Sequence, residues 1–389
     1  MTLLAPARWI VIGIGLLAAI AMGLAILGGG SQPQASSACL NTTLTVGPDQ
    51  ASALQQLIDD GPDGSVLHLK SGTYPVNLLI TRNLTLCGNG PQQTVLEGKP
   101  QGGPVVRIIN SQVIQVALEG LTITQGSIGP GDDSRAGAVE MPRDFNVSNT
   151  IPPYTVFRAN RAQVSLKHVK ITANAGAGLG GALQKEGGLT LQDVEISDNL
   201  DAGILVGSDA DVVLDNVRVI NNGGRIPILG THCIGGGMGL SVLADSPSIV
   251  PSYTLRNIKV VGRNCKNSGS GLGISGAAKV IGQNIQISNN GDAGLGIVRI
   301  AEASLTDVVV EHNGGWGVFL SNPNQTAQFT LKRTKISNNG RSGFYAQGLS
   351  AARLEEVTIE KNGFGECPNP VPRGADDQVC NGLQLRGRS

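Results

Sequence analysis

The sequence has no excess of charge of either sign and few aromatic residues. Its 389 residues include 29 Lys and Arg against 29 Asp and Glu, so the formal net charge is zero. A protein that neutralises nucleic-acid phosphates carries a basic surface, so this balance argues against nucleic acid as a partner. Phe, Tyr and Trp make up only 3% of the residues. Large rings therefore do not build most of the core.

Metal-ligand spacing is also missing. The four His residues are scattered and no Cys-x-x-Cys occurs, which argues against zinc as the reason for the cysteines. We therefore expect no metal site and no cofactor. The six cysteines all follow the apolar N-terminal run, and that arrangement fits disulfides formed in an oxidising compartment.

Glycine is abundant instead, at 55 residues. Its share is about twice the usual ~7% of a protein sequence. It follows no three-residue period, which excludes collagen, and a hydrophobic content of 40% excludes wholesale disorder. Frequent backbone turns with a core of small and branched apolar residues are typical of a repeat protein.

The N-terminus carries a targeting or anchoring segment. Residues 1–8 contain Arg8, and residues 9–27 form an uncharged run of 19 residues, which as a helix spans about 28 Å of a hydrocarbon core of about 30 Å. A retained membrane anchor is one interpretation. A cleaved signal peptide is the other, because Ser36-Ser37-Ala38 offers small residues for cleavage. The single Arg predicts that the N-terminus is cytoplasmic and that residues 39–389 lie outside. Residues 28–38 are expected to form a linker between the apolar run and the domain.

A motif of the form Leu-x-x-Val-x-Ile-x-x-Asn repeats along the chain. It begins at Leu191, Leu214, Leu305 and Leu354 with small variations. Asn residues that end such motifs lie 23 residues apart at 199 and 222, at 267, 290 and 313, and at 339 and 362. A fixed period of this length is the signature of a solenoid.

A second short strand follows most of these Asn residues. It starts at a corner glycine: Gly178, Gly203, Gly271, Gly294, Gly317 or Gly343, and we assign the same position to Gly239 and Gly382. The residue after each corner and the one two further on are apolar from Gly203 onward, so strand alternation points both inward. Leucine-rich repeats share the Leu and Asn pattern, but they need a helical second half that this sequence leaves no room for. The expected fold is all-β, a right-handed parallel β-helix, in which the repeated Asn side chains form a ladder between coils.

The beginning of the domain resembles a known superfamily. Pro48-Asp49 followed by Ala51, Leu54, Leu57 and Ile58 predicts an amphipathic capping helix. Next come a strand and the segment Gly72-Thr73-Tyr74. Two further strands follow, and the second ends at Gly88. This opening is similar to that of the pectin-lyase-like superfamily, and the resemblance covers residues 40–389 in architecture.

The catalytic motifs of that superfamily are missing. Pectin methylesterases place a Glu two residues after the Tyr of the opening, where this chain has Val76. The motifs of polygalacturonases and mannuronan epimerases are also absent from the sequence, and the outward residues that follow the corners include no carboxylate. The resemblance therefore implies a fold without a known chemistry.

Four loops are expected to interrupt the domain, at about 127–161, 223–236, 245–252 and 364–380. The longest contains Glu140, Arg143 and Arg158, the only candidates for an acid/base pair. A solvated loop held by ion pairs is the competing interpretation.

The cysteines predict three disulfides. Cys233 and Cys265 each lie six residues before an expected corner glycine in adjacent coils, at a spacing that suits a disulfide. Cys367 and Cys380 then close the last Pro-rich loop, and Cys39 and Cys87 remain to staple the first coils.

One outward patch combines aromatic and amide groups. Phe319 and Tyr345 occupy the same slot in successive coils, so their rings are expected to lie about 5 Å apart. Trp316 lies beside them, and the register adds Gln347, Gln384 and Arg386. Such a strip fits a sugar ring. The competing interpretation, which the position near the last coil favours, is shielding of the C-terminal end or contact with a second copy.

Two functions follow from these patterns. The first is a non-catalytic protein outside the cytoplasm, membrane-anchored or secreted, that binds a glycan or another cell-surface partner. The alternative is a polysaccharide lyase or hydrolase that uses the 127–161 loop.

Overall fold

The computed structural model describes residues 39, 41–100, 103–127, 137–141, 160–225, 233–234, 237–241, 250–262, 269–321, 328–347, 351–363 and 378–379. They belong to one compact unit, Ser36–Ser389. The predicted anchor at 9–27 lies outside these ranges. Among the residues described, no helix is both long and apolar enough to cross a membrane.

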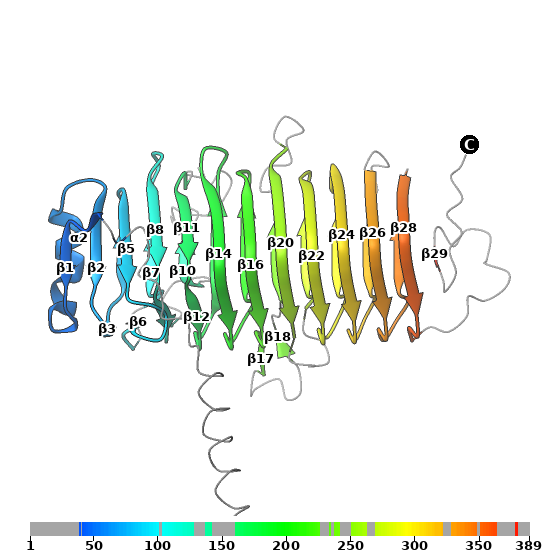
Figure 1. The fold of residues 1–389 in the computed structure, drawn as a ribbon, viewed down its shortest axis with the longest axis horizontal. Coiled ribbons are helices and arrows are strands. Elements are labelled where there is room, and N and C mark those ends of the chain that lie inside the picture. The colour runs from blue at the N-terminus through cyan, green and yellow to red at the C-terminus, as the bar shows by residue number, and fades with distance from the viewer. Residues whose placement is uncertain are drawn as a thin grey trace, which may run out of the picture. The chain divides into compact units, whose positions relative to one another are not determined.

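Stacked parallel strands form this unit, with each coil pairing to the coils before and after it (Figure 1). A 16-stranded sheet, sheet A, makes one side and an 11-stranded sheet, sheet B, the other. The strands of sheet A are β1 (Leu44–Val46), β2 (Ser65–Leu69), β3 (Gly72–Pro75), β5 (Leu84–Gly88), β6 (Thr94–Glu97), β8 (Gln115–Glu119), β9 (Thr122–Thr124), β11 (Gln163–Lys167), β12 (Lys170–Thr172), β14 (Gly188–Ser197), β16 (Val212–Ile220), β20 (Ser252–Val261), β22 (Lys279–Ser288), β24 (Glu302–Glu311), β26 (Gln328–Ser337) and β28 (Ala351–Glu360).

The strands of sheet B are shorter. They are β4 (Leu78–Ile80), β7 (Val106–Ile108), β10 (Gly137–Met141), β13 (Ala177–Leu183), β15 (Ile204–Ser208), β19 (Met238–Ser241), β21 (Leu272–Ser275), β23 (Leu295–Val298), β25 (Val318–Ser321), β27 (Phe344–Gln347) and β29 (Gln378–Val379). The expected parallel β-helix is confirmed. Its core lies between the two sheets and consists mainly of Leu, Ile and Val.

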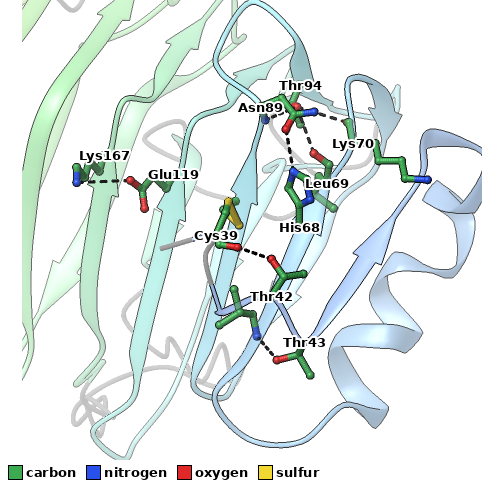
Figure 2. Close-up of a disulfide and its surroundings, with 12 residues drawn as sticks. Cys39, Thr42, Thr43, His68, Leu69, Lys70, Asn89, Thr94, Glu119 and Lys167 are labelled. Atoms are coloured by element: carbon green, nitrogen blue, oxygen red, sulfur yellow. Dashed lines mark hydrogen bonds and ion pairs between the residues drawn. A yellow bond between two sulfur atoms is a disulfide. The ribbon is translucent and has the colours of Figure 1, made fainter. Parts of the chain in front are cut away.

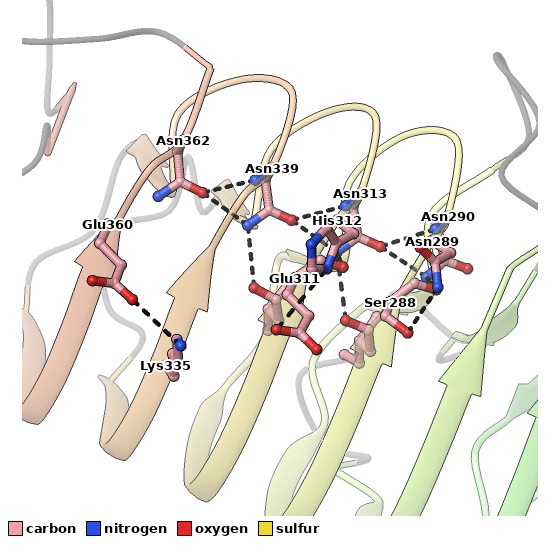
Figure 3. Close-up of polar contacts among 12 residues, drawn as sticks. Ser288, Asn289, Asn290, Glu311, His312, Asn313, Lys335, Asn339, Glu360 and Asn362 are labelled. Carbon is pink, nitrogen blue, oxygen red and sulfur yellow. Dashed lines mark hydrogen bonds and ion pairs between the residues drawn. The ribbon is translucent and has the colours of Figure 1, made fainter.

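The repeated Asn residues form the expected ladder inside the corner (Figure 3). The Nδ2 group of Asn290 donates to Oδ1 of Asn313 at 2.9 Å, and Asn313 repeats this contact with Asn339 at 2.9 Å. Asn339 continues it to Asn362 at 2.9 Å. A second run joins Asn174, Asn199 and Asn222. The Oδ1 atom that accepts each of these bonds also accepts from the backbone N–H of the ladder Asn in the preceding coil. Each buried amide thus satisfies polar backbone of the coil before it.

A short helical segment covers the N-terminal end of the core. A 3₁₀ helix, η2 (Pro48–Ala53), continues into α2 (Leu54–Asp60). Leu54 and Ile58 are buried, which confirms the predicted amphipathic cap. Gly47 is the residue before the first helical turn, and its N–H donates to the Gln50 side chain.

A disulfide staples the first coils (Figure 2). Cys39 and Cys87 are joined, with Cα atoms 5.9 Å apart, which confirms this predicted pair. Glu119 is the partner of Cys87 in the next strand and is 4% exposed, although it points away from the core. Lys167 compensates its charge at 3.6 Å.

The corner predicted at Gly239 is wrong by two residues. Met238 pairs with Ile204 and Leu240 with Val206, so Gly237 takes the corner and Met238 the first inward position. Cys233 therefore lies four residues before its corner, in β18 (Cys233–Ile234), which pairs antiparallel with β17 (Gly224–Arg225). This shift removes the register argument for a Cys233–Cys265 disulfide. Cys265, Cys367 and Cys380 lie outside the described residues, so those two pairs stay predictions.

Three predicted loops contain strands, and the segment 223–236 holds the antiparallel pair β17 and β18 described above. β10 lies within the segment 127–161 and pairs with β7 and β13, so a coil of the solenoid passes through that segment. β29 lies within 364–380 and pairs antiparallel with β27. Neither strand carries the repeat motif, and for that reason the periodicity did not reveal them.

Candidate functional site

The outward face of sheet B carries one continuous row of residues. Register pairs place the members of this row side by side, one in each strand: Leu79, Arg107, Glu140, Gly180, Leu205, Gly239, Gly273, Gly296, Phe319 and Tyr345. Neighbouring members lie about 4.8 Å apart, the spacing of strands in a sheet. The row changes character along its length, from charged through glycine to aromatic.

The glycines of this row form the floor of a surface trough. Its volume is about 370 Å³ and its floor contains Gly239, Gly273 and Gly296. Leu205 lines one end of the trough, and Phe319 with Trp316 lines the other. Ser270, Ser275 and Asp292 supply polar groups at its sides. Leu240, Ile274, Ala293 and Val298 complete the lining, so the trough is mainly apolar with a few polar groups.

An aromatic cluster stands at one end of the trough. Phe319 and Tyr345 stack with ring centroids 5.5 Å apart and planes within 5°, which confirms the predicted stacking. Trp316 tilts against both rings, with centroids at 5.1 Å from Phe319 and 5.9 Å from Tyr345. All three side chains are partly exposed. They form a rigid apolar surface that water still reaches.

A cation completes the cluster on one side. The guanidinium of Arg341 lies over the Trp316 ring, 4.5 Å from its centroid. Arg341 itself is exposed. This contact fixes the orientation of the indole through a cation–π interaction.

The other predicted members of this patch are only partly described. Gln347 pairs with Ser321, so its backbone lies one slot beyond the rings, as the register predicted. Gln378 of β29 is paired with Tyr345, at the position where we expected Gln384. The chain reverses direction here, and this reversal breaks the parallel register on which that expectation rested. Gln384 and Arg386 lie outside the described residues.

Only one of the predicted catalytic candidates lies among the described residues. The backbone of Glu140 lies in β10 between Arg107 and Gly180, at the charged end of the row. The expectation that Glu140 sits in an inserted loop is therefore wrong. Arg143 and Arg158 lie outside the described residues. The structure instead places Arg107, a residue that sequence reasoning passed over, beside Glu140.

A polar strip on sheet A is a second depression, about 400 Å³ in volume. Arg256, Asn257, Gln283, Asn284 and Asp307 line it. Asn257 and Asn284 have left-handed backbone conformations, and their side chains bond to each other at 2.9 Å. Arg333 contacts Asp307 through two bonds of 2.7 and 2.8 Å and lowers the pKa of that carboxyl. These groups satisfy one another across the bend of each coil, so the strip has a structural explanation.

The absence of carboxylates among the outward residues after the corners gave no sign of the trough. The available signal was glycine inside strands of otherwise branched residues, which marks a bulge or a close approach of another molecule. Among the residues described, no group of three His, Cys, Asp or Glu side chains could hold a metal ion.

Known proteins resemble this chain in part of its sequence and in its fold. Residues 238–388 match the family described as "Right handed beta helix region". The A-module of mannuronan C-5 epimerase AlgE4 from Azotobacter vinelandii is similar in structure, with 16% identity, 80% of this chain and 91% of that chain covered, and a TM-score of 0.47. Pectate lyase Pel9A shares 12% identity, with coverage of 85% and 73% and a TM-score of 0.37.

An alginate lyase from Paenibacillus sp. strain FPU-7 is also similar, with 14% identity, coverage of 82% and 97%, and a TM-score of 0.33. No curated protein matches the chain in sequence. Identities at this level show the fold alone. The protein is a right-handed parallel β-solenoid, as its stacked parallel strands and the match of residues 238–388 show.

Proposed function

We propose that this protein acts outside the cytoplasm, held there by residues 9–27 or secreted, and binds a glycan on the outward face of sheet B. The observation that carries the proposal is the cluster of Trp316, Phe319 and Tyr345, exposed and stacked beside a trough. Aromatic faces bind the apolar face of a sugar ring, while hydroxyl and carboxylate oxygens beside them accept hydrogen bonds from the sugar hydroxyls.

Several features support a ligand site over simple shielding of the solenoid end. The Phe319 and Tyr345 rings stand on the side of the solenoid, on strands that have neighbours on both sides. The rings also border a mainly apolar trough whose lining includes Ser270, Ser275 and Asp292. An apolar hollow with a few polar groups is typical of a ligand site, and shielding alone does not require one.

The test is binding to a glycan array by the parent and by Phe319→Ala/Tyr345→Ala, followed by isothermal titration on the best glycan. We expect the double variant to lose about tenfold or more in affinity, because two stacked rings are removed. Ile281→Ala is the matched control, since Ile281 is a 58% exposed apolar residue on sheet A. Unchanged affinity with an unchanged melting temperature would exclude the cluster as the site. A changed oligomeric state would favour contact with a second copy.

An enzyme is the second candidate, and the pairing of Glu140 with Arg107 in adjacent strands favours it. A carboxyl group such as that of Glu140 can act as an acid or base on a sugar chain, and its backbone lies at the charged end of the sheet B row. An assay on a panel of polyuronates, with and without calcium, tests this function. We expect any cleavage to disappear in Glu140→Gln. Absence of product with the parent protein on every polymer would leave binding as the function.

A further inference from the structure

We infer that the trough over Gly239, Gly273 and Gly296 takes the terminal residues of a neutral glycan, with the last sugar ring against the face of Phe319. This inference rests on the proposed function. It adds the charge class of the glycan and the way in which the glycan lies.

The floor glycines are not required by the fold. A Cβ on Gly273 would have its nearest neighbour, the carbonyl oxygen of Met238, at 3.8 Å, and a Cβ on Gly296 would meet the Ser270 hydroxyl at 3.5 Å. Both are ordinary contacts, and neither glycine has a positive φ. Glycine is unfavourable in a strand interior unless something approaches its backbone closely. Gly273 and Gly296 therefore keep the trough open.

The corner glycines of the same sheet provide the contrast. A Cβ on Gly294 would lie 2.6 Å from Nδ2 of Asn313, and a Cβ on Gly317 would lie 2.8 Å from Nδ2 of Asn339. The ladder amides occupy that space, so the fold itself explains these glycines. It does not explain the floor glycines.

Both ends of the trough are walled. At one end Leu205 leans over the floor, since its Cδ1 would lie 3.2 Å from a Cβ on Gly239. At the other end Phe319 stands in the same row, three strand spacings or about 14 Å from Gly239. A long chain cannot continue along the floor past either wall. A short end or a side branch can enter.

Phe319 is the member of the stacked pair that borders the trough. The Tyr345 ring lies parallel to it within 5°, and the Trp316 ring tilts against it at 5.1 Å. Phe319 lines the trough, as does Trp316, whereas Tyr345 does not. A sugar ring above Gly296 would extend this stack by one member.

The charge of the lining selects against acidic sugars. Among the described residues that line the trough, Asp292 carries the only charge, and no Lys or Arg is present. Arg341 contacts Trp316 and is not part of the lining. A carboxylate repels a uronate and accepts hydrogen bonds from the hydroxyls of a neutral sugar. The trough therefore suits a neutral pyranose.

The test uses the full-length protein and isothermal titration with two sets of probes. Trimers and hexamers of β-1,4-glucan, β-1,3-glucan and α-1,4-glucan are the neutral set, and trimers and hexamers of galacturonate and mannuronate are the acidic set. We expect the neutral trimer and its hexamer to have the same dissociation constant per mole of oligosaccharide. The acidic set should bind with a dissociation constant at least about tenfold higher.

Two trough variants, Gly273→Val and Gly296→Val, should each weaken binding of the neutral probe about tenfold or more, because Val fills the floor. Gly188→Val is the matched control. Gly188 is also a strand glycine with an open Cβ position, its nearest atom being Asp211 O at 3.8 Å, but it lies on sheet A. The melting temperatures of all three variants should equal or exceed that of the parent, because Val favours strands.

The outcomes separate this inference from the proposed function. Loss of binding in Phe319→Ala/Tyr345→Ala with full binding in both trough variants overturns the trough and leaves the glycan site at the rings. Preferential binding of the acidic set, or affinity that rises with chain length, overturns the neutral chain end. Full binding in all of these variants overturns both proposals.

Discussion

One asparagine and one glycine depend on each other at most corners of the solenoid. The amide of Asn313 fills the space that a Cβ on Gly294 would need, and Asn339 does the same for Gly317. In return, the missing side chain lets each amide sit buried between two coils and bond to both. The Asn ladder and the corner glycines therefore depend on each other structurally and are not two independent sequence features.

Replacement of Asn313 by Ala tests that device. Asn313 Oδ1 accepts from both the backbone N–H and the side chain of Asn290, so the variant leaves two buried donors without their acceptor. We expect the free energy of unfolding to fall by about 3 kcal/mol, measured by urea denaturation. Asn289→Gly is the control, because Asn289 has a positive φ and its side chain contacts only Ser288 among the described bonds. An equal effect of the two substitutions would contradict the buried ladder.

Tyr74 predicts a dependence of stability on alkaline pH. The Tyr74 hydroxyl donates to the carbonyl oxygens of Val46 and Lys70, and burial is the main cause that raises the pKa of Tyr74 to about 12. In the unfolded chain the same group loses its proton near pH 10. The folded state thus binds more protons between these values, so stability is complete below pH 10 and falls as pH rises toward 12. The melting temperature of Tyr74→Phe should fall less steeply across this interval, and an identical slope would contradict the assignment.

At the scale of single residues, the sequence predicted the aromatic stack but not the trough. Phe319 and Tyr345 each lie two residues after a corner glycine, and that register alone brought their rings together. Gly273 and Gly296 were equally visible, but a glycine has no side chain whose chemistry a motif can predict. Only the space around a hypothetical Cβ distinguishes them from the corner glycines.

At the scale of strands and coils, the one misassigned corner has a definite cause. The segment at 235–239 reads Gly-Gly-Gly-Met-Gly, and either Gly237 or Gly239 can open the strand. A shift of two residues preserves inward and outward alternation, because the strand period is two. The alternation of apolar residues therefore could not separate the two registers. Pairing of Met238 with Ile204 settles the choice for Gly237.

The disulfide of the first coils gives a prediction at this scale. The bond between Cys39 and Cys87 spans 48 residues of sequence, for which the chain-entropy estimate is about 4 kcal/mol. Cys39→Ala/Cys87→Ala should lower the free energy of unfolding by up to that amount, as measured by urea denaturation in the absence of reductant. The parent protein in reductant is the matched comparison. Equal stability of parent and variant in the absence of reductant would show that the bond does not form in the protein.

At the scale of the whole molecule, the repeat predicted the fold class, while strands without the motif, such as β10 and β29, came only from the structure. The period of 23 residues required stacked coils, and the stacked coils required a ladder. No periodic signal exists for β10, because its coil is distant in sequence from its neighbours. That coil carries Glu140 and brings it next to Arg107.

The N-terminal run gives a prediction about location. We expect residues 9–27 to hold the protein in a membrane with residues 39–389 outside, because 19 uncharged residues match the thickness of the hydrocarbon core. Membranes washed with carbonate should retain the protein, and a chain lacking residues 1–38 should be released. An intact mass that begins near Cys39 would instead identify a secreted protein.

The fluorescence of Trp316 tests glycan binding at the aromatic cluster most directly. The chain has two tryptophans, Trp9 and Trp316, so Trp9→Phe leaves an emission signal from the cluster alone. Trp316 contacts both stacked rings and lines the trough. We predict that the glycan selected by the array shifts and saturates this emission with the same dissociation constant that isothermal titration gives. Heat of binding without any change in Trp316 emission would place the glycan elsewhere and contradict the account.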